Sequence, residues 1–361
     1  MNIAIACGGT GGHLFPGIAV GEVLTKRGHK VLLLISEKKI DTLAVHDNKD
    51  FEISRIPAVG LPRFVSPEVV PFGLKFVSGY FSCRQVYRRF HPDVVLGMGG
   101  FTSTAPILAG KSSRLPTYIH ESNAIPGKAN RLNARLAREV LLGFSECASY
   151  FPNRQTRVTG TPIRQTLRLK VDPEQAAKNL RLKPGLQTVA VIGGSQGAHG
   201  VNEAVLAGLP RFAHKPVQFV HLTGTEDHSY VFERYQKEGV PAFVAAFHHR
   251  MEEVYTVADL MVARSGAASL SELSYYGCPS ILIPYPFAAD NHQSLNAAIF
   301  QRAGAAEVLE GTDVNGERLG ELIERLLSEP AKRAEMKRQM LSLAEPNAAE
   351  KIADIVEGKT A

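Results

Sequence analysis

Three glycine-rich segments in this sequence have the composition of loops that bind phosphate. They are Gly8-Gly9-Thr10-Gly11-Gly12-His13, Gly193-Gly194-Ser195-Gln196-Gly197 and Arg264-Ser265-Gly266-Ala267-Ala268-Ser269. Each follows a short apolar run and precedes a segment with helical periodicity. Such a loop offers backbone N–H groups and the positive end of a helix dipole to an anion. The sequence therefore predicts phosphate binding at these loops.

The third segment carries the most specific signal. The amides of Ala267, Ala268 and Ser269 are expected to point at a diphosphate at the start of a helix. Glu272 lies about one turn further along, where its two carboxylate oxygens suit the two hydroxyls of a ribose. The alternative is that Glu272 only stabilises the helix dipole. The local pattern thus favours a nucleotide diphosphate.

The glycine loops also leave a nicotinamide-dependent oxidoreductase open as an alternative. A dinucleotide-binding loop has the pattern G-x-G-x-x-G, which the first loop meets only in part because Leu14 stands at the third glycine. The second loop has Gln196 at the middle position. Glu37, near the end of the second expected strand, would then be the acid that binds the ribose.

Two similar openings predict two domains. The apolar run Ile3–Ala6 precedes the first glycine loop, and Val189–Ile192 precedes the second, 185 residues later in a chain of 361. Apolar runs alternate with helical segments, which is typical of parallel sheets that bind ligands at the carboxyl ends of their strands. The other expected strands are Val31–Ile35, Val94–Gly97, Thr117–His120, Thr156–Val158, Phe219–Leu222, Leu260–Ala263 and Ser280–Pro284.

We therefore predict an α/β protein with two Rossmann-like doubly wound domains that face each other across a cleft. The expected linker between them contains Gly160 and Pro162. The expected domains are residues 1–161 and 162–345. Residues 346–361 are expected to form a C-terminal helix that packs back on the first domain.

The charge is unevenly distributed along the chain. Residues 1–161 hold 20 Lys and Arg against 11 Asp and Glu, whereas the remainder holds 21 against 24. This indicates an anionic partner for the first half, a membrane surface or a nucleic acid, although no nucleic-acid-binding motif accompanies it. No apolar run reaches the roughly 20 residues that span a bilayer, and the start lacks a signal peptide. With four scattered cysteines, these features predict a cytoplasmic protein whose membrane contact is peripheral.

One segment of the basic half has the composition of a membrane-docking patch. Residues 69–81 are rich in aromatic side chains, and Lys128, Arg131, Arg135 and Arg138 follow, with the arginines spaced to share a helix face. Aromatic and cationic side chains suit binding to anionic lipid, whereas the alternative is a core helix beside a solvated basic face. The predicted patch consists of Phe72, Leu74, Lys75, Phe76, Tyr80 and Phe81.

Six motifs together resemble the MurG family of N-acetylglucosaminyltransferases of peptidoglycan synthesis. The three glycine loops are joined, in family order, by Gly97-Met98-Gly99-Gly100-Phe101, His120-Glu121-Ser122-Asn123 and Asp290-Asn291-His292-Gln293. The resemblance implies that the fold is of the GT-B type. It also implies inverting transfer of N-acetylglucosamine from UDP-N-acetylglucosamine to the muramyl 4-hydroxyl of undecaprenyl-diphosphoryl-N-acetylmuramyl-pentapeptide.

The resemblance further implies the setting of this reaction. No cofactor or metal is expected, and the sequence contains no Asp-x-Asp motif of the kind that holds a divalent ion on a diphosphate. The expected location is the cytoplasmic face of the inner membrane. The expected partners are the donor, the lipid-linked acceptor, an anionic membrane surface and cell-wall assembly proteins, without nucleic acid.

By matching position, the resemblance assigns roles to donor-binding residues. Asn123 and Gln293 orient the sugar, with help from His292. Arg164 and the backbone near His248 lie by the uracil and its phosphates. Gln293 has the alternative of being only an N-terminal helix residue. The full donor-binding set is Thr10, Gly11, Gly12, Asn123, Arg164, Ser195, His248, Ala267, Ala268, Ser269, Glu272, His292 and Gln293.

The resemblance makes His13 the expected catalytic base, with Glu121 as the alternative base or acceptor-orienting group. A helix N-terminus lowers the pKa of a histidine and so favours the neutral, proton-accepting form at pH 7. The alternatives are that His13 only hydrogen-bonds its loop, and that His120 and Glu121 form a hydrogen-bonded pair with a structural role.

Three departures from the family pattern bear on donor specificity. Phe101 stands where many relatives have tyrosine, Leu222 replaces a frequent glutamine, and His248-His249-Arg250 replaces an aliphatic-acidic stretch. The alternative functions, besides an oxidoreductase, are another lipid glycosyltransferase, a UDP-sugar 2-epimerase and a non-catalytic nucleotide-binding module.

Overall fold

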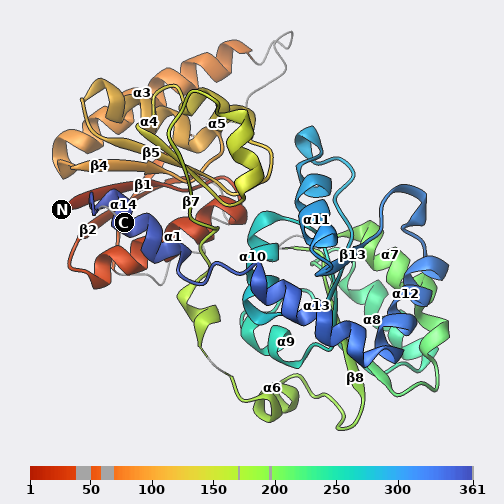
Figure 1. The fold of residues 1–361 in the computed structure, drawn as a ribbon. Coiled ribbons are helices and arrows are strands. Elements are labelled where there is room, and N and C mark those ends of the chain that lie inside the picture. The colour runs from red at the N-terminus through yellow and green to blue at the C-terminus, as the bar shows by residue number, and fades with distance from the viewer. Residues whose placement is uncertain (38–49, 58–68, 170, 195–196, 360–361) are drawn as a thin grey trace. The chain divides into compact units, whose positions relative to one another are not determined.

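The computed structural model describes residues 1–37, 50–57, 69–169, 171–194 and 197–359. These form two compact units (Figure 1): unit 1 is residues 1–165 with 345–361, and unit 2 is residues 166–344. Unit 1 extends past the expected boundary at residue 161. Its last residues contact its first helix, because Arg164 stacks on Phe15 and Lys26 donates to Gln165.

Among the described residues, unit 1 contains a parallel sheet of seven strands in the order β3-β2-β1-β4-β5-β6-β7. The strands are β1 (Asn2–Ala6), β2 (Lys30–Ser36), β3 (Glu52–Ile56), β4 (Val94–Gly97), β5 (Thr117–Glu121), β6 (Glu139–Leu142) and β7 (Thr156–Val158). The helices are α1 (Gly11–Lys26), α3 (Val69–Phe90), α4 (Thr104–Ser112), α5 (Lys128–Asn133) and α14 (Ala348–Val356).

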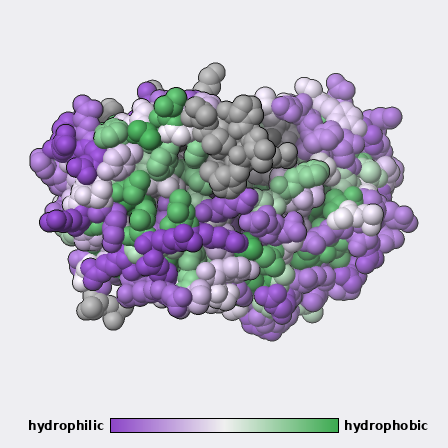
Figure 2. All heavy atoms as spheres, turned by 90° about the horizontal axis from the view of Figure 1, so that it is seen from above, coloured by the Kyte–Doolittle hydropathy of each residue, from purple (hydrophilic) through white to green (hydrophobic). Residues whose placement is uncertain are grey.

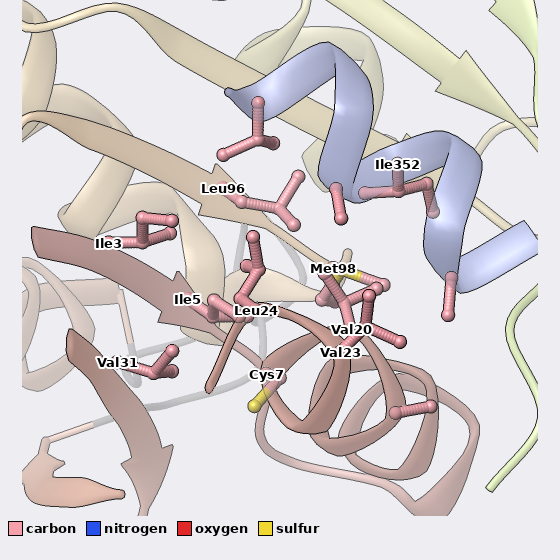
Figure 3. Close-up of a cluster of buried hydrophobic side chains, with 14 of the residues drawn as sticks. Ile3, Ile5, Cys7, Val20, Val23, Leu24, Val31, Leu96, Met98 and Ile352 are labelled. Carbon is pink, nitrogen blue, oxygen red and sulfur yellow. The ribbon is translucent and has the colours of Figure 1, made fainter. Parts of the chain in front are cut away.

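Hydrophobic cores cover both faces of this sheet, because successive side chains of a strand point to opposite faces. Ile3 and Ile5 belong to the core that includes α1 and α14, whereas Ala4 and Ala6 belong to the core on the other face. Figure 3 shows Ile352 of α14 among the side chains of the first core.

The C-terminal segment is also tied to unit 1 by ion pairs. Nη1 of Arg27 lies 2.7 Å from Asp354 and 2.8 Å from Glu357, and Nε2 of His29 lies 2.6 Å from Glu357. The chain therefore leaves unit 1 once and returns to it for its last helix.

Unit 2 is built in the same way. Its described residues form a parallel sheet of six strands in the order β10-β9-β8-β11-β12-β13. The strands are β8 (Gln187–Ile192), β9 (Val217–Leu222), β10 (Ala242–Ala245), β11 (Leu260–Ala263), β12 (Ser280–Leu282) and β13 (Ala306–Val308). The helices are α6 (Pro173–Asn179), α7 (His199–Gly208), α8 (His228–Glu238), α9 (Met251–Val257), α10 (Ala267–Tyr276), α11 (His292–Arg302), α12 (Gly316–Ser328) and α13 (Pro330–Ser342).

Both sheets reverse their strand order next to the first strand of the unit. The reversal lies between β1 and β4 in unit 1 and between β8 and β11 in unit 2. This is the doubly wound arrangement, in which ligands bind beyond the carboxyl ends of the strands at the reversal. The predicted class, α/β with two Rossmann-like doubly wound domains, is confirmed.

Candidate functional site

The candidate site of unit 2 lies at its strand reversal. Ala263 of β11 pairs with Ile192 of β8, so the two strands end at the same edge of the sheet. Gly193 follows β8, and the short segment ending in Gly266 leads from β11 into α10. Two of the predicted phosphate-binding loops are thereby neighbours.

The start of α10 has the geometry predicted for an anion-binding helix end. Gly266 is the N-cap, and the amide of Leu270 is bonded to the Gly266 carbonyl at 2.9 Å. The amides of Ala267, Ala268 and Ser269 come before this bond and have no acceptor within the helix. They are therefore positioned to bind an anion at the edge of the sheet.

Glycines keep the backbone accessible at this edge. A Cβ atom built on Gly194 or Gly266 would have no described atom within 4 Å, and Gly194 has a left-handed φ of +95°. Gly197 is different, since its Cβ would lie 2.2 Å from the carbonyl oxygen of Thr223. Gly197 thus allows the loop to pack, whereas Gly194 and Gly266 leave room for a ligand. Ser195, a predicted diphosphate contact, lies outside the described residues.

Glu272 lies in the second turn of α10, where Tyr255 contacts it. The Tyr255 hydroxyl donates to Oε2 of Glu272 at 2.6 Å. Tyr255 is a site residue that the sequence analysis missed, because it lies on α9 and no local spacing links it to a residue 17 positions away.

The loop before α11 joins the same edge. Oγ of Ser265 donates to the Gln293 carbonyl at 2.8 Å, and Oε1 of Gln293 accepts from the Tyr285 amide at 2.9 Å. The predicted sugar-binding residue Gln293 is therefore held beside the start of α10. The Nδ1 atom of His292 lies 2.8 Å from the carbonyl of Ala289, so this nitrogen is engaged within its own loop.

Arg264 connects the loop after β11 to the loop after β12. Its Nη1 atom donates to the carbonyls of Ile283 at 3.1 Å and Pro284 at 2.9 Å, and its guanidinium stacks over Tyr285. Burial lowers the pKa of Arg264 from its ordinary value. The sequence analysis assigned no role to Arg264. In the structure, its contacts hold the two loops together.

His248 lies on the loop after β10, and its side chain contacts a buried carboxylate. Its Nε2 atom is 3.1 Å from Oε2 of Glu253, while Nη1 of Arg250 is 2.8 Å from Oε1 of the same carboxylate. Two residues of the departure at 248–250, His248 and Arg250, thus contact the same carboxylate. The nucleotide contact predicted for this loop is through its backbone rather than these side chains. It stays a prediction.

In unit 1, His13 lies at the strand reversal. Thr10 is the N-cap of α1, Gly11 and Gly12 are its first residues, and Nδ1 of His13 lies 3.1 Å from the Thr10 hydroxyl. The ring packs against Gly99, since a Cβ atom there would lie 3.0 Å from it. The predicted base is thus held between its own loop and the loop after β4.

The carboxylate of Glu121 accepts four hydrogen bonds from described residues of this unit. Its Oε1 atom accepts from the amide and from Nδ2 of Asn123, both at 3.0 Å. Its Oε2 atom accepts from the amide of Gly127 at 3.1 Å and from Nδ2 of Asn130 at 2.9 Å. Glu121 therefore organises the loop that carries Asn123, and Asn130 is a partner that the sequence analysis missed.

The side chains of His120 and Glu121 have separate hydrogen-bond partners. Nε2 of His120 lies 2.9 Å from the carbonyl of Gly160, and Nδ1 lies 3.3 Å from the hydroxyl of Ser122. Burial lowers the pKa of His120, so the ring is neutral. This histidine of β5 thus contacts the segment that follows β7, two strands away in the sheet.

Arg164, a predicted donor-binding residue, was expected in the second domain. It belongs to unit 1, where its guanidinium lies 4.6 Å from the ring centroid of Phe15 on α1. Arg164 therefore contacts the helix that carries His13.

The predicted membrane patch lies on α3, and only part of it is exposed. Leu74 is 70% exposed and Phe81 64%, and Lys75 is exposed beside them. Val77, which the prediction omitted, is also exposed. Figure 2 views the molecule from above, the side on which α3 lies in Figure 1, and shows hydrophobic side chains among hydrophilic ones. The half-buried members of the predicted patch are Phe72, Phe76 and Tyr80.

Aromatic contacts explain why these three side chains are half buried. Phe72 stacks on Phe76 and meets Phe101 edge-on, each with ring centroids 6.3 Å apart. The hydroxyl of Tyr80 donates to Ser112 of α4 at 3.0 Å. Phe101, a departure from the family pattern, thus packs on α3.

Neither a candidate metal site nor a membrane-spanning helix is found among the described residues. No three side chains of His, Cys, Asp or Glu come together as a candidate metal site within residues 1–359 outside the gaps given above. Among the helices of the described part, none combines the length and apolar character needed to cross a bilayer.

This two-unit fold with its glycine loops is that of a glycosyltransferase, and comparisons with known proteins agree. Residues 3–142 match the glycosyltransferase family 28 N-terminal domain, and residues 188–356 match the glycosyltransferase family 28 C-terminal domain. The chain therefore belongs to glycosyltransferase family 28. This confirms the predicted resemblance and the GT-B type of the fold.

Curated relatives match nearly the whole chain. The UDP-N-acetylglucosamine–N-acetylmuramyl-(pentapeptide) pyrophosphoryl-undecaprenol N-acetylglucosamine transferase of Halothermothrix orenii is 34% identical, over 99% of this chain and 98% of the relative. The enzyme of the same name from Thermodesulfovibrio yellowstonii is 36% identical with the same coverage.

Solved structures are similar over the same extent. MurG of Acinetobacter baumannii matches with a TM-score of 0.78 and 25% identity, covering 99% of both chains. UDP-GlcNAc 2-epimerase from Neisseria meningitidis matches with a TM-score of 0.71 and 14% identity, covering 99% of this chain and 100% of that one. The second likeness shows the fold alone.

Proposed function

We propose that this chain transfers N-acetylglucosamine from UDP-N-acetylglucosamine to the muramyl 4-hydroxyl of undecaprenyl-diphosphoryl-N-acetylmuramyl-pentapeptide. The observation that carries this proposal is the open backbone at the strand reversal of unit 2, where Gly194 and the start of α10 adjoin, with Glu272 one turn beyond. The names of relatives at 34% and 36% identity support the same donor and acceptor.

The leaving group of this reaction is UDP, and its charge must be stabilised as the bond to the sugar breaks. The amides of Ala267, Ala268 and Ser269, with the dipole of α10, supply fixed positive charge for the diphosphate. Glu272 accepts hydrogen bonds from the ribose, and Gln293 binds the sugar. Because these dipoles are already oriented, little reorganisation is needed when the bond breaks.

The acceptor hydroxyl must lose a proton as its oxygen attacks the anomeric carbon. We assign this proton to Nε2 of His13, whose Nδ1 atom faces the Thr10 hydroxyl. The new carbon–oxygen bond forms while the bond to the diphosphate breaks, and attack from the opposite face inverts the anomeric centre. Glu121 is a weaker candidate for the base, because its carboxylate already accepts four hydrogen bonds from N–H donors. We give it the role of holding Asn123.

The acceptor is a lipid, so the enzyme must reach a membrane surface. We propose that the exposed side chains of Leu74, Val77 and Phe81, with Lys75 and the basic charge of unit 1, dock on anionic lipid at the cytoplasmic face of the membrane. Contacts with cell-wall assembly proteins are a further expectation from the family resemblance.

Isothermal titration calorimetry with matched glycine variants tests the donor site. Gly194 and Gly185 both have a left-handed φ and open space around the Cβ position, so alanine imposes similar backbone strain at each. We expect UDP and UDP-N-acetylglucosamine to bind without added metal, Gly194→Ala to weaken UDP about tenfold, and Gly185→Ala to leave it unchanged. Binding of NAD but not UDP, or equal effects of the two variants, would contradict the assignment.

A further inference from the structure

Tyr255 and Glu272 form a contact between two helices of unit 2. The Tyr255 hydroxyl lies 2.6 Å from Oε2 of Glu272, within the range for an O–H donor on a carboxylate. Tyr255 lies on α9 and is only 3% exposed, while Glu272 lies on α10. The hydroxyl therefore reaches Glu272 from inside the protein.

Several contacts hold the tyrosine itself. Its ring centroid is 5.2 Å from that of Tyr276, and its backbone carbonyl accepts from Sγ of Cys278 at 3.6 Å. Burial raises the pKa of Cys278 to about 12, so this thiol stays protonated as a donor. The Tyr276 hydroxyl donates to the carbonyl of Leu167 at 2.6 Å. Both tyrosines are thus fixed by buried neighbours.

We infer that Tyr255, supported by Tyr276, is a positioning residue that holds the Glu272 carboxylate in the rotamer needed to bind the ribose hydroxyls of the donor. The inference rests on the proposed function, since it takes Glu272 as the ribose ligand. A glutamate that is free to rotate loses side-chain freedom on binding, and a carboxylate fixed beforehand avoids that cost.

This arrangement also selects the sugar of the nucleotide. A nucleotide that lacks the 2′-hydroxyl leaves a fixed carboxylate oxygen without its hydrogen bond, which is the kind of mismatch that a polar site rejects strongly. A carboxylate released from Tyr255 can turn toward other partners and discriminates less. The inference therefore predicts that Tyr255 controls the preference for UDP over 2′-deoxy-UDP.

Calorimetry of the full chain with UDP and 2′-deoxy-UDP tests this inference. We expect Tyr255→Phe to weaken UDP about five- to tenfold and to lower the ratio of the two affinities. Tyr276→Phe should lower the ratio less. Tyr275→Phe is the matched control, since the Tyr275 hydroxyl lies on the same helix as Tyr276 but forms no hydrogen bond with the described residues, and this variant should change neither value. Inorganic pyrophosphate, which has no ribose, should bind all three variants and the native protein alike.

The outcomes separate this inference from the proposed function. If Glu272→Gln binds UDP as tightly as the native protein, the ribose role of Glu272 fails. If Glu272→Gln weakens UDP while Tyr255→Phe keeps the native affinity ratio, the positioning role alone is overturned. Should Tyr255→Phe fail to fold, an unchanged ratio in Tyr276→Phe overturns the inference.

Discussion

The hydroxyl of Thr10 lies 3.1 Å from Nδ1 of His13. We propose that this hydroxyl accepts from Nδ1–H, so that Nε2 is the proton-accepting nitrogen of the neutral ring. Valine keeps the branched shape of threonine but removes the acceptor. We expect Thr10→Val to lower kcat about tenfold with less than a twofold change in KM for the donor.

Nitrogen-15 NMR of histidine-labelled protein checks the reason for this effect. The native ring should titrate from the tautomer protonated on Nδ1, and the variant should show a mixture of tautomers. An unchanged kcat, or an unchanged tautomer in a slower variant, would remove Thr10 from this role.

Gly99 provides a test of the space around His13. It has a left-handed φ of +102°, and a Cβ atom on it would lie 3.0 Å from the imidazole. Gly28 also has a left-handed φ, +84°, but no atom lies within 4 Å of its Cβ position. Both alanine variants should lose about 1 kcal/mol of stability through backbone strain. Only Gly99→Ala should also lower kcat, by about tenfold or more, because it displaces the ring. Equal kcat values for the two variants would contradict this placement.

Exposed side chains of α3 provide a test of membrane docking. The double variant Leu74→Ser/Phe81→Ser removes apolar surface that is 70% and 64% exposed. We expect its flotation with vesicles that contain anionic lipid to fall several-fold, while its calorimetric affinity for UDP is unchanged. Tyr230→Ser/Phe232→Ser on α8 is the control, since these large side chains are also exposed, by 43% and 46%, but belong to unit 2. Flotation that depends on neither pair would argue against docking through α3.

His221 should make the stability of unit 2 sensitive to acid. It is fully buried, with Nδ1 3.1 Å from the Tyr235 hydroxyl and Nε2 3.0 Å from Oδ1 of Asn202. Burial lowers the pKa of His221 from 6.5 to about 3. Between these values the unfolded chain binds a proton that the folded protein does not, so the free energy of unfolding decreases as the pH falls, by up to about 1.4 kcal/mol per pH unit.

Urea denaturation of native protein and His221→Gln between pH 7 and pH 5 measures this contribution. The variant should be less stable at pH 7, because it loses a buried hydrogen-bond network. Its stability should nevertheless depend less steeply on pH than that of the native protein. Parallel pH profiles would show that His221 titrates normally.

The sequence predicted the central strands of both sheets but missed several others. Central strands such as β1 and β8 are buried on both faces, so their sequences are continuous apolar runs. The edge strand β3 reads Glu-Ile-Ser-Arg-Ile and is mostly half-buried or exposed, which leaves little apolar pattern. The strands β6 and β13 contain Glu139 and Glu307, so neither is a continuous apolar run.

The candidate site was predictable where its chemistry is local in the sequence. The glycine loops and Glu272 follow from the spacing within one strand–loop–helix unit. Tyr255, Asn130 and Arg264 act through contacts with residues distant in sequence or with backbone carbonyls, so no spacing reveals them. The α3 patch stays a prediction, and the structure shows that the 3.6-residue period turns its half-buried members Phe72, Phe76 and Tyr80 toward the protein.

The central claim is that this chain joins N-acetylglucosamine to a lipid-linked muramyl peptide. Its most direct test is transfer of radiolabel from UDP-N-acetylglucosamine to synthetic lipid-linked N-acetylmuramyl-pentapeptide, without added metal. We expect labelled lipid product and an equal amount of UDP, and a loss of about 10²-fold or more in turnover with His13→Ala while UDP still binds. Absence of transfer, or conversion of the donor to an epimer in the absence of acceptor, would contradict the account.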